Sequence, residues 1–254
     1  MKTEWILTPQ FFELPEPVLA NIVPDGAVVN GPHDIADRSF AALAGVHRPI
    51  AEFVNNTVLS GRVPVSVAGD CCAAIPVMAG VQAAGHAPVL VWLDAHGDFN
   101  TLKTSPSGFL GGMPLAMMVG RGDQGLVRQS DLTPLDETSV WLVDARDLDP
   151  LENQALDTSQ VNRCDMAGFG NLRLNRPVHL HLDIDVIDAS QAPGTRYPVA
   201  NGPDVAETVA ACVKFATANE IIAISVSGWT GALDVDGTTS RACDVILQGL
   251  TGVA

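Results

Sequence analysis

Short runs of consecutive apolar residues alternate along this chain with longer segments in which apolar residues recur every three or four positions. The apolar runs predict strands at 63–68, 89–93, 139–144, 178–184 and 220–226. The helical spacing predicts helices between them at 72–84, 112–119, 150–157 and 203–218. Because strands and helices alternate, we expect an α/β fold, a three-layer αβα arrangement around a mostly parallel sheet covered on both faces.

Less regular segments flank this alternating region. Prolines break the apolar pieces between Ile6 and Asn30, and only 27–29 has strand character there. Helical spacing predicts an amphipathic helix over 34–51 that leads on toward Val54, and a further helix over 240–250. No linker, repeat or low-complexity segment divides the chain, so residues 1–254 are predicted to form one domain.

Composition and charge narrow the classes of partner. The chain has 254 residues and is 47% hydrophobic, with 29 acidic and 14 basic residues and a net charge of −15. Since no cluster of Lys or Arg occurs, we expect neither nucleic acid nor a membrane surface as partner. No signal peptide or long apolar run is visible, which predicts a cytoplasmic protein. Five cysteines at irregular spacing argue against a disulfide framework.

Three polar residues follow the apolar run that ends at Leu93. Asp94, His96 and Asp98 are spaced two apart, so an extended backbone would point all three to one side. Two carboxylates and an imidazole suit Mn(II), Mg(II) or Fe(II) better than a structural zinc. Taken alone, the same pattern also fits a strand end with a solvated acidic turn.

A second strand repeats the arrangement. Asp183 and Asp185 end the run over 178–184 in the same spacing, and Asp70 and Cys71 follow the strand at 63–68. In a parallel sheet, ligands bind outside the carboxyl ends of the strands. Two strand ends that present spaced carboxylates therefore predict a two-metal hydrolytic centre.

Three motifs along the chain resemble those of the ureohydrolase superfamily, to which arginase and agmatinase belong, and they occur at plausible separations. Residues 94–98 resemble its DAHxD motif, residues 183–188 its DxDxxDP motif and residues 69–72 its GGDHS motif, and the likeness extends from about residue 60 to the C-terminus. The resemblance implies two Mn(II) ions that activate a hydroxide. The implied metal ligands are Asp94 and Asp183 as bridges, Cys71 and Asp98 on one ion, and His96 and Asp185 on the other. Asp98 is also the implied catalytic residue, which would orient the hydroxide and pass on its proton.

The chain departs from the superfamily pattern at several positions. Cys71 stands in place of the GGDHS histidine, and it is either a thiolate ligand or an inert buried thiol. Gly111 occupies the position of the histidine that shuttles protons in arginase. Gly228 replaces the glutamate that pairs with the substrate guanidinium, and Tyr197 replaces a threonine.

Other arginase-like features are retained, and they imply an amino-acid substrate. Asn100, Ser105 and Ser107 resemble residues that contact the α-carboxylate, whereas Asp149 and Glu152 resemble residues that read the α-ammonium group. The alternative for Asp149 and Glu152 is that they are acids at a helix N-terminus, where the dipole favours them. His181 shares the facing of Asp183, and it either supports the ligands or packs in the core.

The departures bear on the substrate. An arginine guanidinium is charged at physiological pH, and without a carboxylate partner it should bind poorly. An N-hydroxyguanidine is much less basic, so the chain looks most like the hydrolases of Nω-hydroxy-L-arginine in D-cycloserine biosynthesis, which release L-ornithine and hydroxyurea. Arginase, guanidino-acid or formiminoglutamate hydrolase activity, and a non-catalytic metal-binding paralogue, remain alternatives. Since the long C-terminal tail of trimeric arginases is missing, we expect a monomer.

Overall fold

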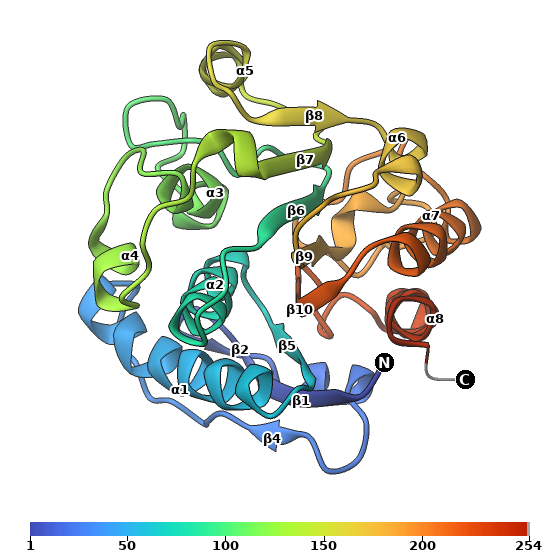
Figure 1. The fold of residues 1–254 in the computed structure, drawn as a ribbon, viewed down its shortest axis with the longest axis horizontal. Helices are drawn as coiled ribbons and strands as arrows, with labels where there is room; N and C mark the ends of the chain where they lie inside the picture. The colour runs from blue at the N-terminus through green and yellow to red at the C-terminus, as the bar shows by residue number, and fades with distance from the viewer. Residues whose placement is uncertain (253–254) are drawn as a thin grey trace.

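Eight strands form the central sheet, and each pair of neighbours in it is parallel (Figure 1). The computed structural model describes residues 1–252. The order across the sheet is β4 (Val28–Val29), β1 (Thr3–Thr8), β5 (Val63–Ala68), β10 (Ile221–Ser227), β9 (Val178–Asp183), β6 (Val89–Asp94), β7 (Val140–Asp144) and β8 (Asn162–Cys164). A separate antiparallel pair, β2 (Gln10–Phe11) and β3 (Leu14–Pro15), follows β1.

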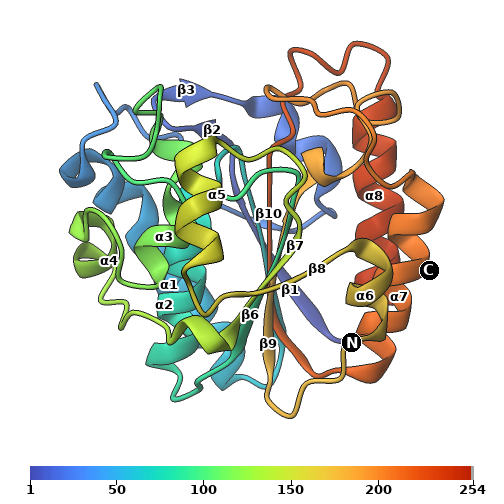
Figure 2. The same ribbon diagram turned by 90° about the horizontal axis from the view of Figure 1, so that it is seen from above.

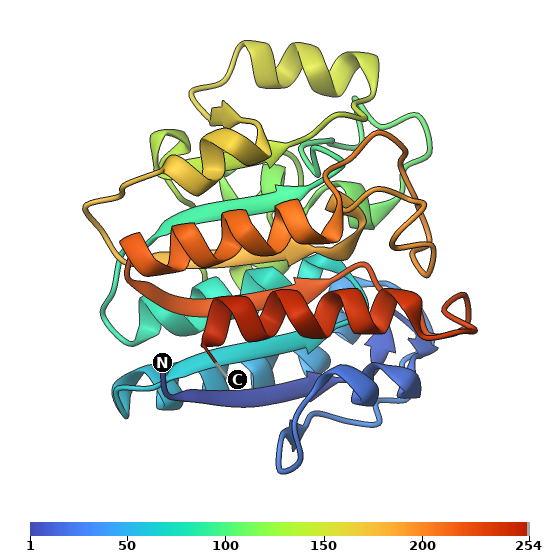
Figure 3. The same cartoon turned by 90° about the vertical axis from the view of Figure 1, so that its right-hand side faces the viewer.

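Helices cover both faces of this sheet, as Figure 2 shows. One face carries α1 (Phe40–Leu59), α2 (Ala74–Ala83), α3 (Pro114–Met118) and α4 (Gly125–Gln129). The other carries α6 (Met166–Asn171), α7 (Val205–Ala218) and α8 (Thr238–Thr251), and Figure 3 looks onto α7 and α8 from that side. α5 (Pro150–Asp157) lies toward the β8 edge (Figure 1). Within residues 1–252, no helix is long and apolar enough to cross a membrane.

Short 3-10 helices complete the chain, and most of them adjoin a strand end. They are η1 (Pro17–Ile22), η2 (Cys71–Ala73), η3 (Leu110–Gly112), η4 (Glu137–Ser139) and η5 (Ile184–Val186). η2 follows β5, and η5 follows β9 directly. The backbone therefore turns sharply at the carboxyl ends of these two strands, which keeps the residues that follow close to the sheet.

The apolar runs explain the middle of the sheet. All six residues of β6 and of β9 and all seven of β10 are buried, since helices on both faces cover them. Large buried clusters lie on the two sides, one around Phe169 and Phe215 under α6 and α7, the other around Phe99 and Trp92. The predicted α/β class with a mostly parallel sheet is confirmed.

Several predicted boundaries are wrong. The helix predicted over 34–51 begins at Phe40, because the Ser39 side chain accepts a hydrogen bond from the Ala42 N–H, and it runs on to Leu59. The helices predicted over 72–84 and 112–119 are shorter, since each follows a 3-10 turn. Strands β1 and β8 and helices α4 and α6 were not predicted. Only the second half of β1 is buried. Its first half contains Glu4, which pairs with Arg62, so the strand has no continuous apolar run that would predict it.

Candidate metal centre

The proposed ligands lie where neighbouring strands of the sheet end. Asp94 is the last residue of β6 and Asp183 the last of β9, and the register pairs Leu93 with Leu182 directly before them. Ser227 at the end of β10 pairs with Asp183 on its other side. Cys71 opens η2, three residues after the last residue of β5, which is the next strand beyond β10. Parallel pairing thus brings four strand ends to one edge of the sheet.

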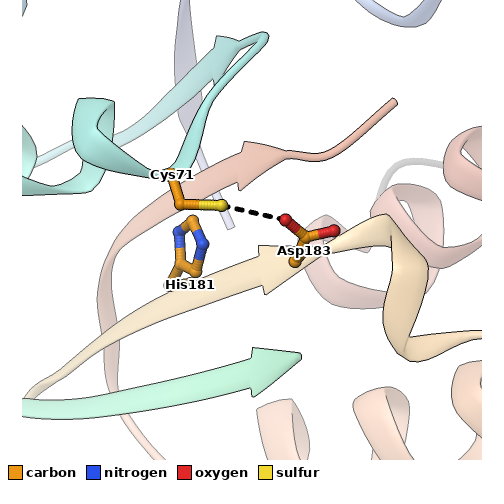
Figure 4. Close-up of side chains that lie close together, drawn as sticks. All are labelled: Cys71, His181 and Asp183. Carbon is orange, nitrogen blue, oxygen red and sulfur yellow. Dashed lines mark hydrogen bonds between the residues drawn. The ribbon is translucent and has the colours of Figure 1, made fainter. Parts of the chain in front are cut away.

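The side chains at this edge form three overlapping groups whose ligand atoms lie within 4.8 Å of one another. The groups are Cys71 with Asp94 and Asp98, Asp94 with His96 and Asp185, and Cys71 with His181 and Asp183. Figure 4 shows the third, in which the Cys71 sulfur and the Asp183 carboxylate point toward each other across 2.9 Å. The structure therefore brings together all six residues that the sequence suggests as ligands, and it adds His181.

Backbone and indole N–H groups hold the carboxylates in place. Trp92 Nε1 donates to Asp94 Oδ2 at 3.0 Å, and the His96 N–H donates to Asp94 Oδ1 at 2.7 Å. The Asp185 N–H donates to Asp183 Oδ1 at 2.9 Å, and the Ala95 N–H donates to Asp185 Oδ1 at 3.2 Å. These donors fix the carboxylates before any ligand binds, while other lone pairs remain free to face the centre.

The centre brings four acidic side chains together where little solvent reaches them. Asp94, Asp98, Asp183 and Asp185 are all buried. Burial, then the charges of Asp94 and Asp183, raise the pKa of Asp98 well above its usual value. Burial opposes charge on His96, but hydrogen bonds to Asp185 and Asp94 outweigh it and raise the pKa of the imidazole to about 12. Metal binding would therefore compete with protons for these side chains.

The donor set fits divalent cations. Asp98 Oδ2 is buried and has no hydrogen-bond partner among residues 1–252, which is costly unless a cation or a proton satisfies it. Four carboxylates and one imidazole suit a hard ion such as Mn(II). Burial, then the charge of Asp183, raise the pKa of the Cys71 thiol well above its usual value, so a thiolate at this position requires a neighbouring cation.

A cavity of about 320 Å³ opens onto these ligands. It is lined by all six proposed ligands and also by every residue suggested as a substrate contact, namely Asn100, Ser105, Ser107, Asp149 and Glu152. Asn100 Nδ2 donates to Asp149 Oδ2 at 2.9 Å, while Asn100 Oδ1 is buried without a partner within the described chain. An unsatisfied amide oxygen at this place is available to a ligand that donates hydrogen bonds.

Glu152 also has a structural role. Its Oε1 accepts from the Phe99 N–H at 2.8 Å, and its Oε2 accepts from the Asp149 N–H at 3.2 Å, at the start of α5. The interpretation as a helix N-terminal acid therefore holds for Glu152, and the same carboxylate joins α5 to the loop that carries Asp98. Because it also lines the cavity, the two interpretations are compatible.

At two positions that depart from the superfamily pattern, neighbouring atoms leave no space for a side chain. Gly228 has φ +85°, and a Cβ there would stand 1.9 Å from Asp183 Oδ1. A Cβ on Gly111 would stand 2.4 Å from the ring of Phe109. Phe109 in turn contacts the rings of Phe11 and Tyr197, with centroids 6.3 Å and 5.3 Å away. Neither side chain could be introduced without displacement of the proposed ligand Asp183 or of the Phe109 ring.

Sequence reasoning missed part of the site. Phe11 and Arg196 line the cavity, and Arg196 stacks on the Phe11 ring and pairs with Glu16. The N-terminal segment offered no signal for this, because Phe11 is an ordinary apolar residue in a proline-broken stretch. Ser225 and Ser227 on β10 also contact His181 and Asp183, and no role was predicted for them, because the partners of a serine on a buried strand depend on strand register.

Three other residues close to these strand ends have structural roles. Trp229 is buried and its Nε1 donates to Asp234 at 2.9 Å, so it packs and does not line the cavity. Asp188 accepts from the Ser190 N–H at 2.9 Å in a turn. Cys72 is fully buried in the apolar cluster that contains Trp92.

Comparison with known proteins agrees with this geometry. The sequence profile of the arginase family matches residues 23–251, which begins earlier than the resemblance expected from about residue 60. The arginase of Bacillus caldovelox is 31% identical over 230 residues, which span 85% of this chain and 77% of that protein. The crystal structure of arginase from Bacillus cereus superposes with a TM-score of 0.83 at 26% identity, over 100% of this chain and 99% of that one.

A more distant structure shows the same fold. Entamoeba histolytica arginase in complex with L-ornithine superposes with a TM-score of 0.82 at 20% identity and covers 99% of each chain. The family profile spans most of the sequence, and the parallel sheet places the motif residues at one edge. The chain therefore belongs to the arginase family, whose members are hydrolases that act on guanidino C–N bonds.

Proposed function

We propose that this protein hydrolyses Nω-hydroxy-L-arginine to L-ornithine and hydroxyurea with two Mn(II) ions. Water adds to the guanidino carbon, the bond from that carbon to Nδ breaks, and Nδ gains a proton. The hydroxylated nitrogen, the second guanidino nitrogen and the new carbonyl oxygen leave together as hydroxyurea. The α-amino acid end takes no part in the reaction and serves for binding.

One observation carries the choice of substrate: the closed surface at Gly228 and Gly111. The superfamily places a guanidinium-binding glutamate and a proton-shuttling histidine at these two positions. In this chain Asp183 lies against the Gly228 backbone, and the Phe109 ring lies against the Gly111 backbone. Because cations would engage the Asp183 carboxylate, a charged guanidinium there would lose its hydration without gaining a free carboxylate as partner. An N-hydroxyguanidine can bind as a neutral group, so it avoids that penalty.

The six ligand candidates would hold the cations. Asp94 lies in two of the three groups, with Cys71 and Asp98 in one and with His96 and Asp185 in the other, so it could contribute to both cation sites. Asp183, which is grouped with Cys71, would serve as a further ligand. Two Mn(II) ions bound there would supply Lewis acidity and activate water at neutral pH.

The chain's own side chains would orient the substrate and move the proton. As the resemblance implies, Asp149 and Glu152 would present carboxylates to the α-ammonium group, and Asn100, Ser105 and Ser107 would present polar groups to the α-carboxylate. Asp98 Oδ2, which has no partner in the part of the chain that the structure describes, would accept the proton that the attacking water loses. With no histidine at position 111, Asp98 would then pass this proton onward to Nδ.

Product analysis tests this proposal. The Mn(II)-loaded protein is incubated at neutral pH with matched concentrations of Nω-hydroxy-L-arginine or L-arginine, and ornithine, hydroxyurea and urea are quantified. We expect hydroxyurea from the first substrate and negligible urea from the second. Asp98→Asn should lower turnover by at least about 100-fold, in the range that general acid–base residues contribute. Asp157→Asn, which changes an exposed carboxylate outside the cavity, should have no effect.

Hydrolysis of L-arginine is the second candidate, favoured by the curated relatives that are named arginase. Comparable turnover of L-arginine would support it and would contradict the importance assigned to Gly228 and Gly111. No turnover of either substrate would contradict both candidates.

A further inference from the structure

Four buried side chains behind the metal centre form a continuous hydrogen-bonded series that ends at Cys71. His179 Nε2 lies 2.8 Å from Ser225 Oγ, which lies 2.8 Å from His181 Nδ1. His181 Nε2 lies 3.3 Å from Ser227 Oγ, and Ser227 Oγ lies 3.2 Å from Cys71 Sγ. All five residues are buried, and the two histidines and two serines are at most 3% exposed. His179, at the inner end of the series, is completely buried.

Strand register builds this series. β9 and β10 pair in parallel with His181 beside Ser225 and Asp183 beside Ser227, so the two serines face the two residues that approach the centre. The Trp92 ring lies against the His181 ring, with centroids 3.7 Å apart and planes at 31°. The imidazole is thus held between two strands and an indole. Figure 4 shows the His181 ring close to Cys71 and to Asp183.

The number of available protons determines which atom donates in each hydrogen bond of the series. Ser225 has one hydroxyl proton and touches two imidazole nitrogens, so one imidazole donates to it and the other accepts from it. His179 Nδ1 has no partner in the described chain, and a buried nitrogen without a partner is better tolerated as an acceptor than as an N–H. This assigns the His179 proton to Nε2, from which it is donated to Ser225. Ser225 then donates to His181 Nδ1, and His181 Nε2–H donates to Ser227.

This assignment leaves the Ser227 hydroxyl proton free for the centre. Its nearest acceptors are Cys71 Sγ at 3.2 Å and Asp183 Oδ2 at 3.3 Å. Asp183 Oδ2 already accepts from the Cys71 thiol at 2.9 Å. When Cys71 becomes a thiolate the sulfur can only accept, so the contact from Ser227 becomes its hydrogen bond.

We propose that Ser227, oriented by His181, is a positioning residue that donates a hydrogen bond to the Cys71 sulfur and holds it as a metal ligand. This inference rests on the proposed function, in which Cys71 is a ligand. The hydrogen bond fixes the direction of the sulfur and withdraws part of its negative charge, which tunes its bond to the metal. Partners of this kind commonly alter metal affinity by about 10-fold to 100-fold.

A titration with Cd(II) tests the proposal without catalysis. The metal-free protein is titrated with Cd(II), and thiolate-to-metal charge-transfer absorption and binding heat are recorded together. The wild-type protein should show the absorption band, and Cys71→Ala should lack it. Ser227→Ala should bind the same number of ions about 10-fold more weakly, with the band shifted in wavelength. Ser227→Thr, which restores the hydroxyl, should return the band to its wild-type position.

Ser66→Ala is the matched control. Ser66 lies on β5, the strand beside β10, is 1% exposed, and its hydroxyl has no partner within residues 1–252. It should leave both the band and the affinity unchanged. If Ser227→Ala behaves like Ser66→Ala while the Cys71 band is present, the inference is wrong and the proposed function stands. If the wild-type protein lacks the band, Cys71 is not a ligand, and both the inference and this part of the proposed function fail.

Discussion

At the scale of single residues, Gly228 limits what the site can become. Its backbone has φ +85°, and a Cβ would stand 1.9 Å from Asp183 Oδ1, so any side chain must displace a proposed ligand. We predict that Gly228→Ala weakens Mn(II) binding by at least about 10-fold. Gly228→Glu should likewise fail to create arginine turnover. Calorimetric titration with Mn(II) and a urea assay measure the two effects.

Gly26→Ala separates collision from backbone strain. Gly26 has a similar φ of +87°, but a Cβ there meets nothing within 4 Å. It should cost about 1–2 kcal/mol of unfolding free energy from the left-handed conformation alone and leave Mn(II) affinity unchanged. Equal metal affinity in Gly26→Ala and Gly228→Ala would contradict the steric argument.

His47 makes the stability of the protein depend on pH. Burial lowers the pKa of this imidazole to about 4, and its Nδ1 lacks a partner within the described residues. In the unfolded chain the histidine pKa is about 6.5, so between pH 6.5 and 4 the unfolded state binds a proton that the folded state rejects. The free energy of unfolding should therefore fall with falling pH in this window by about 1.4 kcal/mol per pH unit from His47 alone.

His47→Leu should remove this contribution. Urea unfolding of the metal-free protein from pH 7 to pH 4.5 should give a shallower loss of stability for the variant than for the wild-type protein. His86→Gln, which removes an exposed histidine, is the control. Parallel curves for His47→Leu and the wild-type protein would show that the imidazole is not buried in its neutral form.

At the scale of elements, Glu152 connects α5 to the loop after β6. Its two oxygens accept from the Phe99 and Asp149 N–H groups, so it fixes the loop of Asp98 and the start of the helix at once. Glu152→Gln places an NH2 group against one of these donors. We predict a loss of about 1–3 kcal/mol in unfolding free energy. We also expect a rise in KM for the amino-acid substrate that exceeds the change in kcat.

Glu207→Gln is the matched control for this element. Glu207 occupies the same third position of α7, accepts from the Asp204 N–H at 3.0 Å, and lies outside the cavity. It should lose a smaller amount of stability, because it is exposed to solvent, and should keep KM unchanged. An equal rise in KM for both variants would show that Glu152 acts only through global stability.

The sequence predicted those strands whose apolar pattern matches their burial in the folded protein. Strands β5, β6, β9 and β10 are buried on both faces and read as continuous apolar runs, so they were found. Edge strands such as β8, with Arg163 exposed, are short and polar and were not. Spacing indicated the ligand candidates Asp94, His96, Asp98, Asp183 and Asp185, whereas Cys71 was suggested only by its place in the GGDHS-like motif. The partners of His181, and the ring that closes Gly111, depend on strand register and loop packing, which a single sequence does not encode locally.

At the scale of the whole molecule, the centre should trade stability for metal binding. Four buried carboxylates meet at one edge of the sheet, and the Asp98 pKa is raised by burial and by the charges of Asp94 and Asp183. Without a cation this arrangement destabilises the fold. Cations that bind only the folded state should recover that energy in proportion to the logarithm of their concentration.

Asp98→Asn tests this trade directly. Asp98 has φ +47°, a conformation that asparagine also tolerates, so the substitution changes charge with little change of backbone. In the presence of a chelator, the free energy of unfolding of the variant should be about 1–3 kcal/mol higher than that of the wild-type protein, because an unsatisfied buried carboxylate is removed. With Mn(II) the order should reverse, since the wild-type protein gains more from the metal. Urea unfolding with and without Mn(II) measures both differences. If, in the presence of a chelator, Asp98→Asn is no more stable than the wild-type protein, the carboxylates already satisfy one another in the metal-free fold.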